Sequence, residues 1–230
     1  MLAPWQSLIV AIDGPAASGK GTLARRIAEK FQLAHLDTGK IYRATGLAVL
    51  VADGNPADPV AAEKAAQNLD FATLADSRLR QEDVARASSV VAAIPSVRAA
   101  LLEAQRRFAH HPPQIGDMPA KGAVLDGRDI GTVVCPDADV KLFLVASAES
   151  RAFRRAKELR PDDAAAIYDS VLQDMRERDA RDSERRVAPL AAAPDAITID
   201  TTSLDADQVF EQASALIARH IAPAGADHLG

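Results

Sequence analysis

Short apolar runs that end in turn residues predict the strands of a parallel sheet. Leu8–Ile12 is continuously apolar and stops at Asp13 and Gly14, which is typical of a strand buried on both faces. Further runs of this kind are Ala34–Leu36, Ala123–Leu125, Val140–Val145 and Ala196–Ile199. Because helical patterns separate them, we expect an α/β fold with a five-stranded parallel sheet covered by helices on both faces.

Apolar residues that recur every third or fourth position predict the helices. Leu23, Ile27 and Phe31 share one face of a helix that follows the first strand. Other helices are predicted over Ile41–Ala52, Glu149–Arg160, Asp163–Ser183 and from Asp205 onward.

The middle of the chain has a different pattern. Residues 60–110 are alanine-rich and helical, with Val97, Leu101, Ala104 and Phe108 predicted on one buried face. Turn residues at Asp53–Pro59 separate this segment from the preceding helix. We therefore expect a mostly helical insert over 53–110 in a core made of 1–52 and 111–230.

Composition and charge exclude several classes of protein. The chain has 230 residues, 48% hydrophobic and 26% charged, as expected for a globular protein with a core. A formal net charge of −5 argues against a dedicated nucleic-acid binder. No apolar run approaches the ~18 residues of a membrane span, and the N-terminus lacks a signal-peptide pattern. Cys135 is the only cysteine, so we expect a cytoplasmic protein in which it is a small semi-buried apolar residue.

A glycine-rich turn between the first strand and the first helix predicts a phosphate site. The segment matches G-x-x-x-x-G-K, whose backbone N–H groups and helix start surround phosphate oxygens while the lysine reaches the β and γ phosphates. The strand–loop–helix context is the one this motif requires. The predicted ATP-phosphate residues are Gly14, Pro15, Ala16, Ala17, Ser18, Gly19, Lys20, Gly21 and Thr22.

Two residues are candidates for holding Mg²⁺. The usual motif has Ser or Thr directly after the lysine, but here Gly21 stands there and the hydroxyl belongs to Thr22. Asp126 ends a strand, where P-loop proteins commonly place a carboxylate that holds the metal directly or through water. We expect Thr22 and Asp126 as ligands. The G-K-G-T order is closer to nucleoside monophosphate kinases than to GTPases, whose N-K-x-D motif is absent.

Three segments rich in arginine and aspartate point to a second, anionic substrate. They are 37–43, 126–132 and 178–186. The first two follow predicted strand ends, where open α/β sheets bind ligands. For the third, a solvated helix face remains an alternative.

At these segments the chain resembles the bacterial-type cytidylate kinases. The matching motifs are Val10–Pro15, the G-K-G-T loop, Leu36–Arg43, Ala87–Arg98, Leu125–Ala138 and Arg178–Leu190. The resemblance covers roughly 8–220. It departs at Phe71–Asp83, which is shorter than the family's stretch of short antiparallel strands.

The resemblance implies roles for individual residues. Arg43, Arg128 and Arg185 resemble the monophosphate-binding arginines, and guanidinium groups suit phosphate oxygens bidentately. Arg178 and Asp182 resemble the ribose-contacting pair. Ser89, Arg98 and Asp129 resemble the cytosine-recognising residues, with Thr38 and Tyr42 near the nucleotide. Lys20, Arg128, Asp129 and Arg185 are the expected catalytic residues.

The implied reaction is transfer of the γ-phosphoryl group of ATP, with Mg²⁺, to CMP or dCMP. The acceptor phosphate is already anionic, so alignment and charge stabilisation replace a strong general base. A basic run predicts a small lid at about 151–165, and its spacing puts Arg151, Arg154 and Arg155 on one helix flank. One or two arginines of this lid, with Arg154 and Arg155 as the candidates, are expected to close over the phosphates, and a solvated helix face remains the alternative. We expect a monomer that binds small nucleotides and neither nucleic acid nor membrane. Another small-molecule P-loop kinase, or a P-loop ATPase or GTPase, remains the alternative.

We predict that Asp129→Ala weakens the preference for CMP over UMP more than the affinity for ATP. Cytosine presents an amino donor to a carboxylate, whereas uracil presents a carbonyl there, and such a mismatch discriminates by up to ~10⁴-fold. Steady-state kcat/KM for both monophosphates and KM for ATP measure the effect. An unchanged preference would exclude Asp129 from base recognition.

Overall fold

Five parallel strands form the single sheet of the described chain. The computed structural model describes residues 8–185 and 187–222. The strands are β1 (Leu8–Asp13), β2 (Ala34–Asp37), β3 (Gly122–Gly127), β4 (Val140–Val145) and β5 (Ile197–Asp200), in the spatial order β2-β3-β1-β4-β5. All carboxyl ends therefore lie at one edge, and the predicted α/β class with five parallel strands is confirmed.

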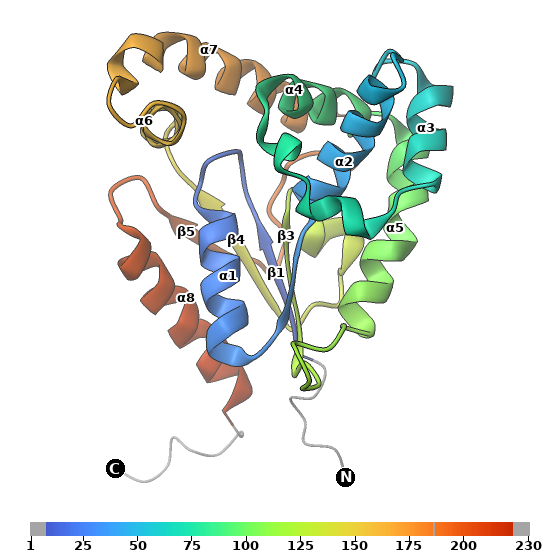
Figure 1. The fold of residues 1–230 in the computed structure, drawn as a ribbon. Coiled ribbons are helices and arrows are strands. Elements are labelled where there is room, and N and C mark those ends of the chain that lie inside the picture. Colours follow the sequence, from blue (N-terminus) through green and yellow to red (C-terminus); the bar gives the residue numbers. More distant parts are fainter. Residues whose placement is uncertain (1–7, 186, 223–230) are drawn as a thin grey trace, which may run out of the picture.

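Helices cover both faces of this sheet (Figure 1). Val10 and Ile12 of β1 face a core formed with α1 (Lys20–Phe31) and α8 (Ala206–Ile221). Ile9 and Ala11 face the opposite core, formed with α2 (Thr38–Val51) and α5 (Pro95–His110). Burial on both sides explains why the strand is a continuous apolar run.

The central segment is helical, as predicted. It contains α3 (Pro59–Gln67), two 3-10 turns (Phe71–Ala75 and Ser77–Arg80), α4 (Glu82–Val91) and α5. The expected buried stripe on α5 is partly wrong, because Ala104 and Phe108 are only half-buried and Gln105 and Ala109 are buried instead. Gln105 tolerates burial because its amide donates to the Leu101 carbonyl at 3.1 Å.

Above the carboxyl edge of the sheet, α6 (Ala148–Leu159) and α7 (Ala164–Ser183) lie opposite the helices of the central segment (Figure 1). A π-helical turn, η3 (Ile130–Val134), follows β3, and the adjacent Cys135 is fully buried. In the described chain, no single helix has the length and apolar character needed to cross a membrane, and one bent pair, α4 with α5, passes by length and composition only.

Candidate active site

The predicted phosphate loop lies between β1 and the first turn of α1. Gly14 and Gly19 have φ values of 146° and 93°, which favour glycine. A Cβ on Gly14 would come within 2.2 Å of the Leu144 carbonyl oxygen, so no larger residue fits there. Helix α1 begins at Lys20, and the N-cap Gly19 has no side chain to occupy the free N–H groups. These backbone donors are therefore available to an anion.

Three side chains hold the loop from its inner side. Lys20 Nζ donates to the Pro15 carbonyl at 2.6 Å, and Thr201 Oγ1 donates to the Ser18 carbonyl at 3.2 Å. Arg151 Nη1 donates to the Ala16 carbonyl at 3.2 Å while Nη2 binds Asp179 at 2.6 Å. Arg151, one of the basic run expected on one helix flank, is thus a buried connection between the loop and α7.

A pocket next to the loop, here called the inner pocket, collects most of the predicted substrate residues. It is lined by Thr38, Tyr42, Ser89, Arg98, Arg128, Asp129, Arg178, Asp182 and Arg185, among others. These residues come from α2, α4, α5, the β3–η3 segment and α7, so segments distant in sequence converge here. Of the predicted CMP-binding residues, only Arg43 is not part of its lining.

A buried ion pair forms one wall of the inner pocket. Arg98 Nη2 donates to Asp129 Oδ2, and the two side chains are 8% and 6% exposed. The Arg98 guanidinium also lies 5.4 Å from the centre of the Tyr42 ring. A buried pair of this kind holds both groups in a fixed orientation, as hydrogen-bonding to a polar base requires.

The opposite wall carries an excess of positive charge. Arg128 Nε donates to Asp182 Oδ2 at 2.9 Å, and Arg185 Nε donates to the Asp182 carbonyl at 3.2 Å. Burial, with the charge of Arg128, lowers the pKa of Arg178 to about 9. Arg178 Nε and Arg185 Nη2 are buried without a hydrogen-bond partner among the described residues. Such donors suit an anion.

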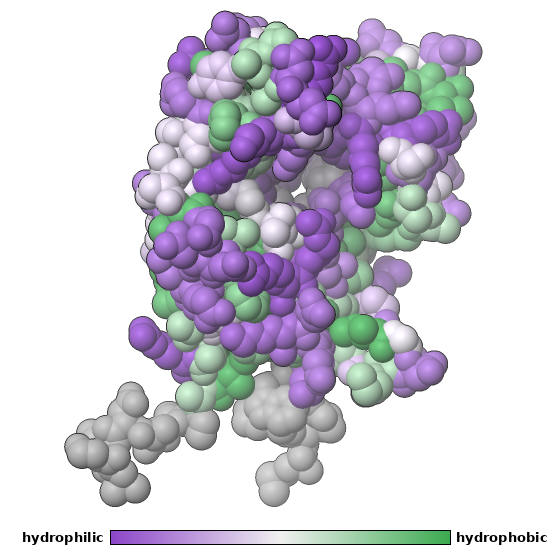
Figure 2. Space-filling view, turned by 60° about the vertical axis from the view of Figure 1, so that its left-hand side comes forward, coloured by the Kyte–Doolittle hydropathy of each residue, from purple (hydrophilic) through white to green (hydrophobic). Residues whose placement is uncertain are grey.

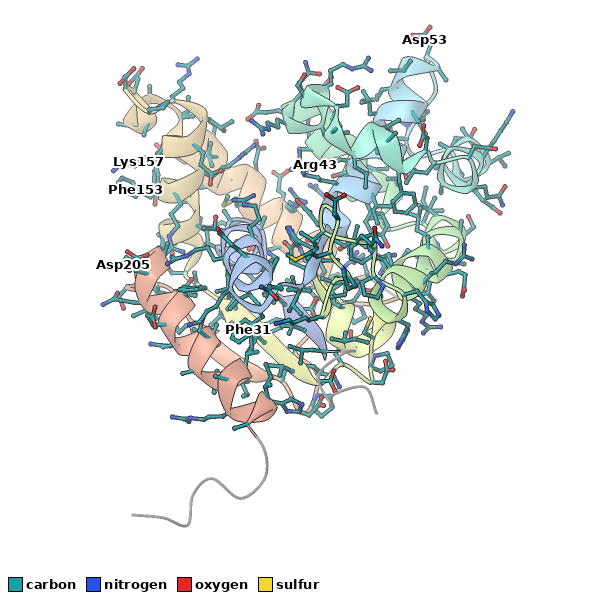
Figure 3. The ribbon with its side chains drawn as sticks, turned by 60° about the horizontal axis from the view of Figure 1, so that its bottom comes forward. Phe31, Arg43, Asp53, Phe153, Lys157 and Asp205 are labelled. Atoms are coloured by element: carbon teal, nitrogen blue, oxygen red, sulfur yellow. The ribbon has the colours of Figure 1, made fainter. Side chains whose placement is uncertain are left out.

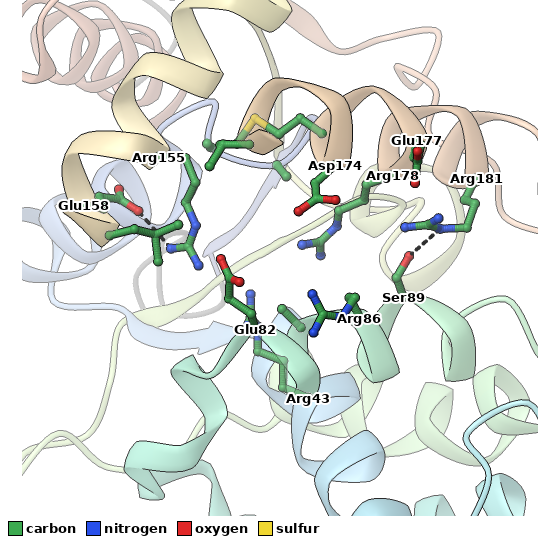
Figure 4. Close-up of a pocket in the computed structure, with 16 residues that line it drawn as sticks. Arg43, Glu82, Arg86, Ser89, Arg155, Glu158, Asp174, Glu177, Arg178 and Arg181 are labelled. Atoms are coloured by element: carbon green, nitrogen blue, oxygen red, sulfur yellow. Dashed lines mark hydrogen bonds and ion pairs between the residues drawn. The ribbon is translucent and has the colours of Figure 1, made fainter. Parts of the chain in front are cut away.

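Outside the inner pocket is a larger arginine cleft, defined by Ala16, Ala17, Arg43, Glu82, Arg86, Ser89, Arg155, Glu158, Arg178 and Arg181 together with neighbouring residues of α7 (Figure 4). Figure 2 shows a hollow on this side of the molecule, rimmed mainly by hydrophilic residues. Burial, with the charge of Arg155, lowers the pKa of Arg43. Arg43 Nη1 donates to the Leu79 carbonyl at 2.8 Å, which positions it beneath the cleft.

The two candidate lid arginines occupy different places. Arg155 lines the arginine cleft and binds Glu158 at 3.1 Å. Arg154 instead donates to Thr201 and Leu204 carbonyls and lines an outer pocket with Ser18, Gly19 and Thr22. The two side chains therefore line different cavities, and their closure over the phosphates stays a prediction.

The two predicted Mg²⁺ ligands also lie apart. Thr22 is exposed and lines the outer pocket, where Arg25 donates to its hydroxyl at 3.4 Å. Asp126 is buried beneath Gly21, since a Cβ built on Gly21 would lie 3.6 Å from Asp126 Oδ2. His35 Nε2 lies 2.9 Å from Asp126 Oδ1, a contact that the sequence analysis did not foresee.

Comparison with known proteins agrees with this geometry. A sequence model of the family described as cytidylate kinase matches residues 10–219. The chain belongs to the cytidylate kinase family. A "Cytidylate kinase" of Rhodospirillum rubrum is 57% identical over 211 residues, covering 92% of this chain and 97% of that protein. Another "Cytidylate kinase", of Paramagnetospirillum magneticum, is 58% identical over 211 residues, covering 92% and 98%.

A solved structure of an uncharacterized protein from Eubacterium ventriosum is similar in fold, with a TM-score of 0.51 at 14% identity over 93% of this chain and 99% of that one. Together with the family match, this confirms the predicted family, the α/β fold class and a kinase that acts on cytidylate as a nucleoside monophosphate kinase.

Sequence reasoning missed a carboxylate that shapes the site of this kinase. Asp13, at the end of β1, accepts hydrogen bonds from the backbone N–H groups of Ile130 and Gly131 at 2.8 and 2.7 Å. It thereby fixes the turn directly after Arg128 and Asp129. The strand-end rule that singled out Asp126 applies equally to Asp13, so the signal was present but unused.

We predict that Asp13 makes stability depend on pH. Burial, partly offset by the two backbone hydrogen bonds, raises the pKa of Asp13 from 3.8 to about 6. The folded chain therefore binds more protons than the unfolded chain between about pH 4 and 6, and the stabilisation from Asp13 is lost as pH rises through this window. Asp13→Asn removes this titration. The unfolding free energy of the native chain minus that of the variant should therefore be larger at pH 4.5 than at pH 7.5.

Urea unfolding at both pH values measures this difference. Asp117→Asn, which changes an exposed carboxylate, is the control and should give the same small difference at both. A larger native-minus-variant difference at pH 7.5 would contradict the prediction.

Proposed function

We propose that this kinase transfers the γ-phosphoryl group of ATP to CMP or dCMP, giving ADP and the nucleoside diphosphate. The observation that carries the proposal is the set of cations between the phosphate loop and the inner pocket, where Lys20 is buried and three arginines are half-buried. Burial, followed by the charge of Arg128, lowers the pKa of Lys20, and burial also lowers the pKa of Arg43, Arg178 and Arg185. Cations of this kind, which form no ion pair with a carboxylate among the described residues, fit phosphate groups arriving from both sides.

In the proposed mechanism, the loop Gly14–Thr22 holds the phosphates of ATP. Lys20 Nζ leaves the Pro15 carbonyl for the β and γ phosphates. Arg43, Arg128 and Arg185 hold the acceptor phosphate, and their charges stabilise the transferring phosphoryl group. Since the acceptor oxygen is already ionised, alignment and electrostatics carry the catalysis.

The donor atoms near the loop fit a magnesium ion held largely by substrate. The described residues contain no group of three or more His, Cys, Asp and Glu side chains that could hold a metal by themselves. Mg²⁺ commonly uses one or two carboxylates, waters and substrate phosphates. Asp126, next to Gly21, would supply such a carboxylate, directly or through water, and Mg²⁺ would neutralise phosphate charge. We keep Thr22 as a second candidate ligand, although it lies on the outer side of the loop.

Base recognition is assigned to Ser89, Arg98 and Asp129, and ribose contact to Arg178 and Asp182, with Thr38 and Tyr42 lining the same pocket. Asp129 accepts a hydrogen bond from the cytosine amino group, whereas Arg98 and Ser89 donate hydrogen bonds to the acceptor atoms N3 and O2 of the base. The Arg98–Asp129 pair supports this assignment because it presents a donor and an acceptor side by side in a fixed geometry.

We further propose that residues 53–110 form a nucleotide-binding insert and about 151–165 a lid on the core of 1–52 and 111–230. The arginine cleft between α4 and α6 supports this division, since closure would bring Arg155 toward Arg43 and Arg178. The same proposal has the kinase act as a cytoplasmic monomer whose partners are ATP, CMP and dCMP.

We predict ADP release from Mg-ATP with CMP or dCMP, and little with UMP or AMP. A coupled assay, with each monophosphate supplied separately, tests the proposed reaction. Equal rates with UMP would remove the base-recognising roles of Asp129 and Arg98. Turnover without any acceptor would instead favour an ATPase.

We also predict that the two lid arginines separate kinetically. Arg155→Ala should lower kcat about tenfold, because it removes one charged contact to phosphate. Arg154→Ala should raise KM for ATP and change kcat less, since it loosens the segment at Thr201 that holds the phosphate loop. Lys157→Ala is the matched control, because Lys157 lies beside Phe153 on the side of α6 away from Arg43 (Figure 3). Equal loss of kcat in both arginine variants would contradict the separation.

A further inference from the structure

The Ser89 hydroxyl lies between the inner pocket and the arginine cleft and is bound from the cleft side. Arg181 Nε, on α7, donates to Ser89 Oγ, on α4, at 3.3 Å (Figure 4). Ser89 is only 5% exposed and lines both cavities. Arg181 lines the arginine cleft but not the inner pocket. Arg181 therefore reaches the inner pocket only through Ser89.

This contact favours Ser89 as a hydrogen-bond donor toward any further partner. A guanidinium group carries donors and no acceptor, so the Ser89 oxygen has to accept from Arg181. The single hydroxyl proton then remains for another partner, and within the described chain the structure gives no hydrogen bond donated by Ser89. The neighbouring Ser88 differs, because its hydroxyl already donates to the Ala85 carbonyl at 2.8 Å.

We propose that Arg181 is a specificity-determining positioning residue, which makes the Ser89 hydroxyl a hydrogen-bond donor toward the pyrimidine base. The inference rests on the proposed function, since it takes cytosine as the base in the inner pocket. The ring nitrogen N3 of cytosine accepts a hydrogen bond, whereas N3 of uracil carries a hydrogen. Arg181 occupies one of the two lone pairs of the Ser89 oxygen and polarises the hydroxyl. Ser89 therefore donates to N3 of cytosine more readily than it accepts from N3–H of uracil with its remaining lone pair.

The effect of the Arg181 charge on substrate binding can be measured separately from its effect on the Ser89 hydroxyl. CMP and UMP carry the same phosphate charge, so loss of one positive charge weakens both to the same extent. The ratio of their kcat/KM values therefore reports the hydrogen-bond direction alone. Because Arg181 is exposed, its replacement removes little packing.

The test uses Arg181→Gln, whose amide oxygen can accept the Ser89 proton and so release the hydroxyl. We expect the CMP/UMP ratio of kcat/KM to fall about tenfold, mainly through KM, with kcat for CMP nearly unchanged. Arg176→Gln is the control: Arg176 lies on the same helix and binds the exposed Glu149 at 3.0 Å. It should leave the ratio as it is in the native chain.

A double-mutant cycle identifies the route of the effect. In a Ser89→Ala background, Arg181→Gln should cause no further fall in the ratio, because the hydroxyl it controls is gone. Titration of the ATP-free protein with CMP and with UMP gives the same comparison for binding alone.

An unchanged ratio in Arg181→Gln would overturn the inference, and so would an equal fall with and without Ser89. If the native chain still releases ADP with CMP, either of these two results would overturn the inference about Arg181 and leave the proposed function unaffected. A native chain that releases no ADP with CMP would overturn the proposed function, and the inference with it.

Discussion

The partial burial of several cations close together, strengthened by their mutual repulsion, is the constraint around which the site is built. Lys20, Arg43, Arg178 and Arg185 all have pKa values lowered by burial. The charge of Arg128 adds to the lowering of the pKa at Lys20 and at Arg178. Asp182 compensates part of this positive charge. Although Asp182 is buried, Arg128 and Arg178 lower the pKa of its carboxyl group. The folded protein holds this charge because a large apolar core supplies the free energy. Two anionic substrates would relieve it, so the same repulsion that weakens the free protein favours their binding.

Such charges are useful only if their positions are fixed, and backbone contacts fix them. Asp13 accepts from both Ile130 and Gly131 and so holds the π-helical turn after Asp129. Thr38 Oγ1 donates to the Asp126 carbonyl at 2.8 Å and joins the start of α2 to the end of β3. These contacts come from strand ends that meet because the sheet is parallel. The topology thus determines how accurately the arginines are placed.

Much of the fold could be predicted because it depends on local patterns. The strands are short and largely apolar, and glycines at 14 and 19 supply two of the positive φ values that the phosphate loop requires. The residues that line the inner pocket were named from the resemblance to a family, and among them only Thr38, Arg128 and Asp129 directly follow strand ends. What the sequence could not show is the direction of individual side chains. Arg154 and Arg155 are adjacent, yet only the packing of α6 decides that they face different cavities.

The contacts that the sequence did not reveal mostly join segments that are distant in the chain. His35 meets Asp126 across two neighbouring strands, and Arg181 meets Ser89 across two helices. No spacing rule links 89 to 181 or 35 to 126, because each distance depends on how whole elements dock. The short segment Phe71–Asp83 is a similar case, since its composition gave no sign of the two 3-10 turns it forms.

Helix α7 links the two halves of the site by the spacing of its own residues. Arg181 and Asp182 lie three and four positions after Arg178, so the three share one face of the helix and line the inner pocket or the arginine cleft. Asp179, on the adjacent flank, binds Arg151, which in turn holds the Ala16 carbonyl of the phosphate loop. A shift of α7 would therefore move the phosphate loop, the cation cluster and Ser89 together. Because phosphoryl transfer depends on alignment, a single helix connected to both the phosphate loop and the inner pocket would keep their relative positions constant.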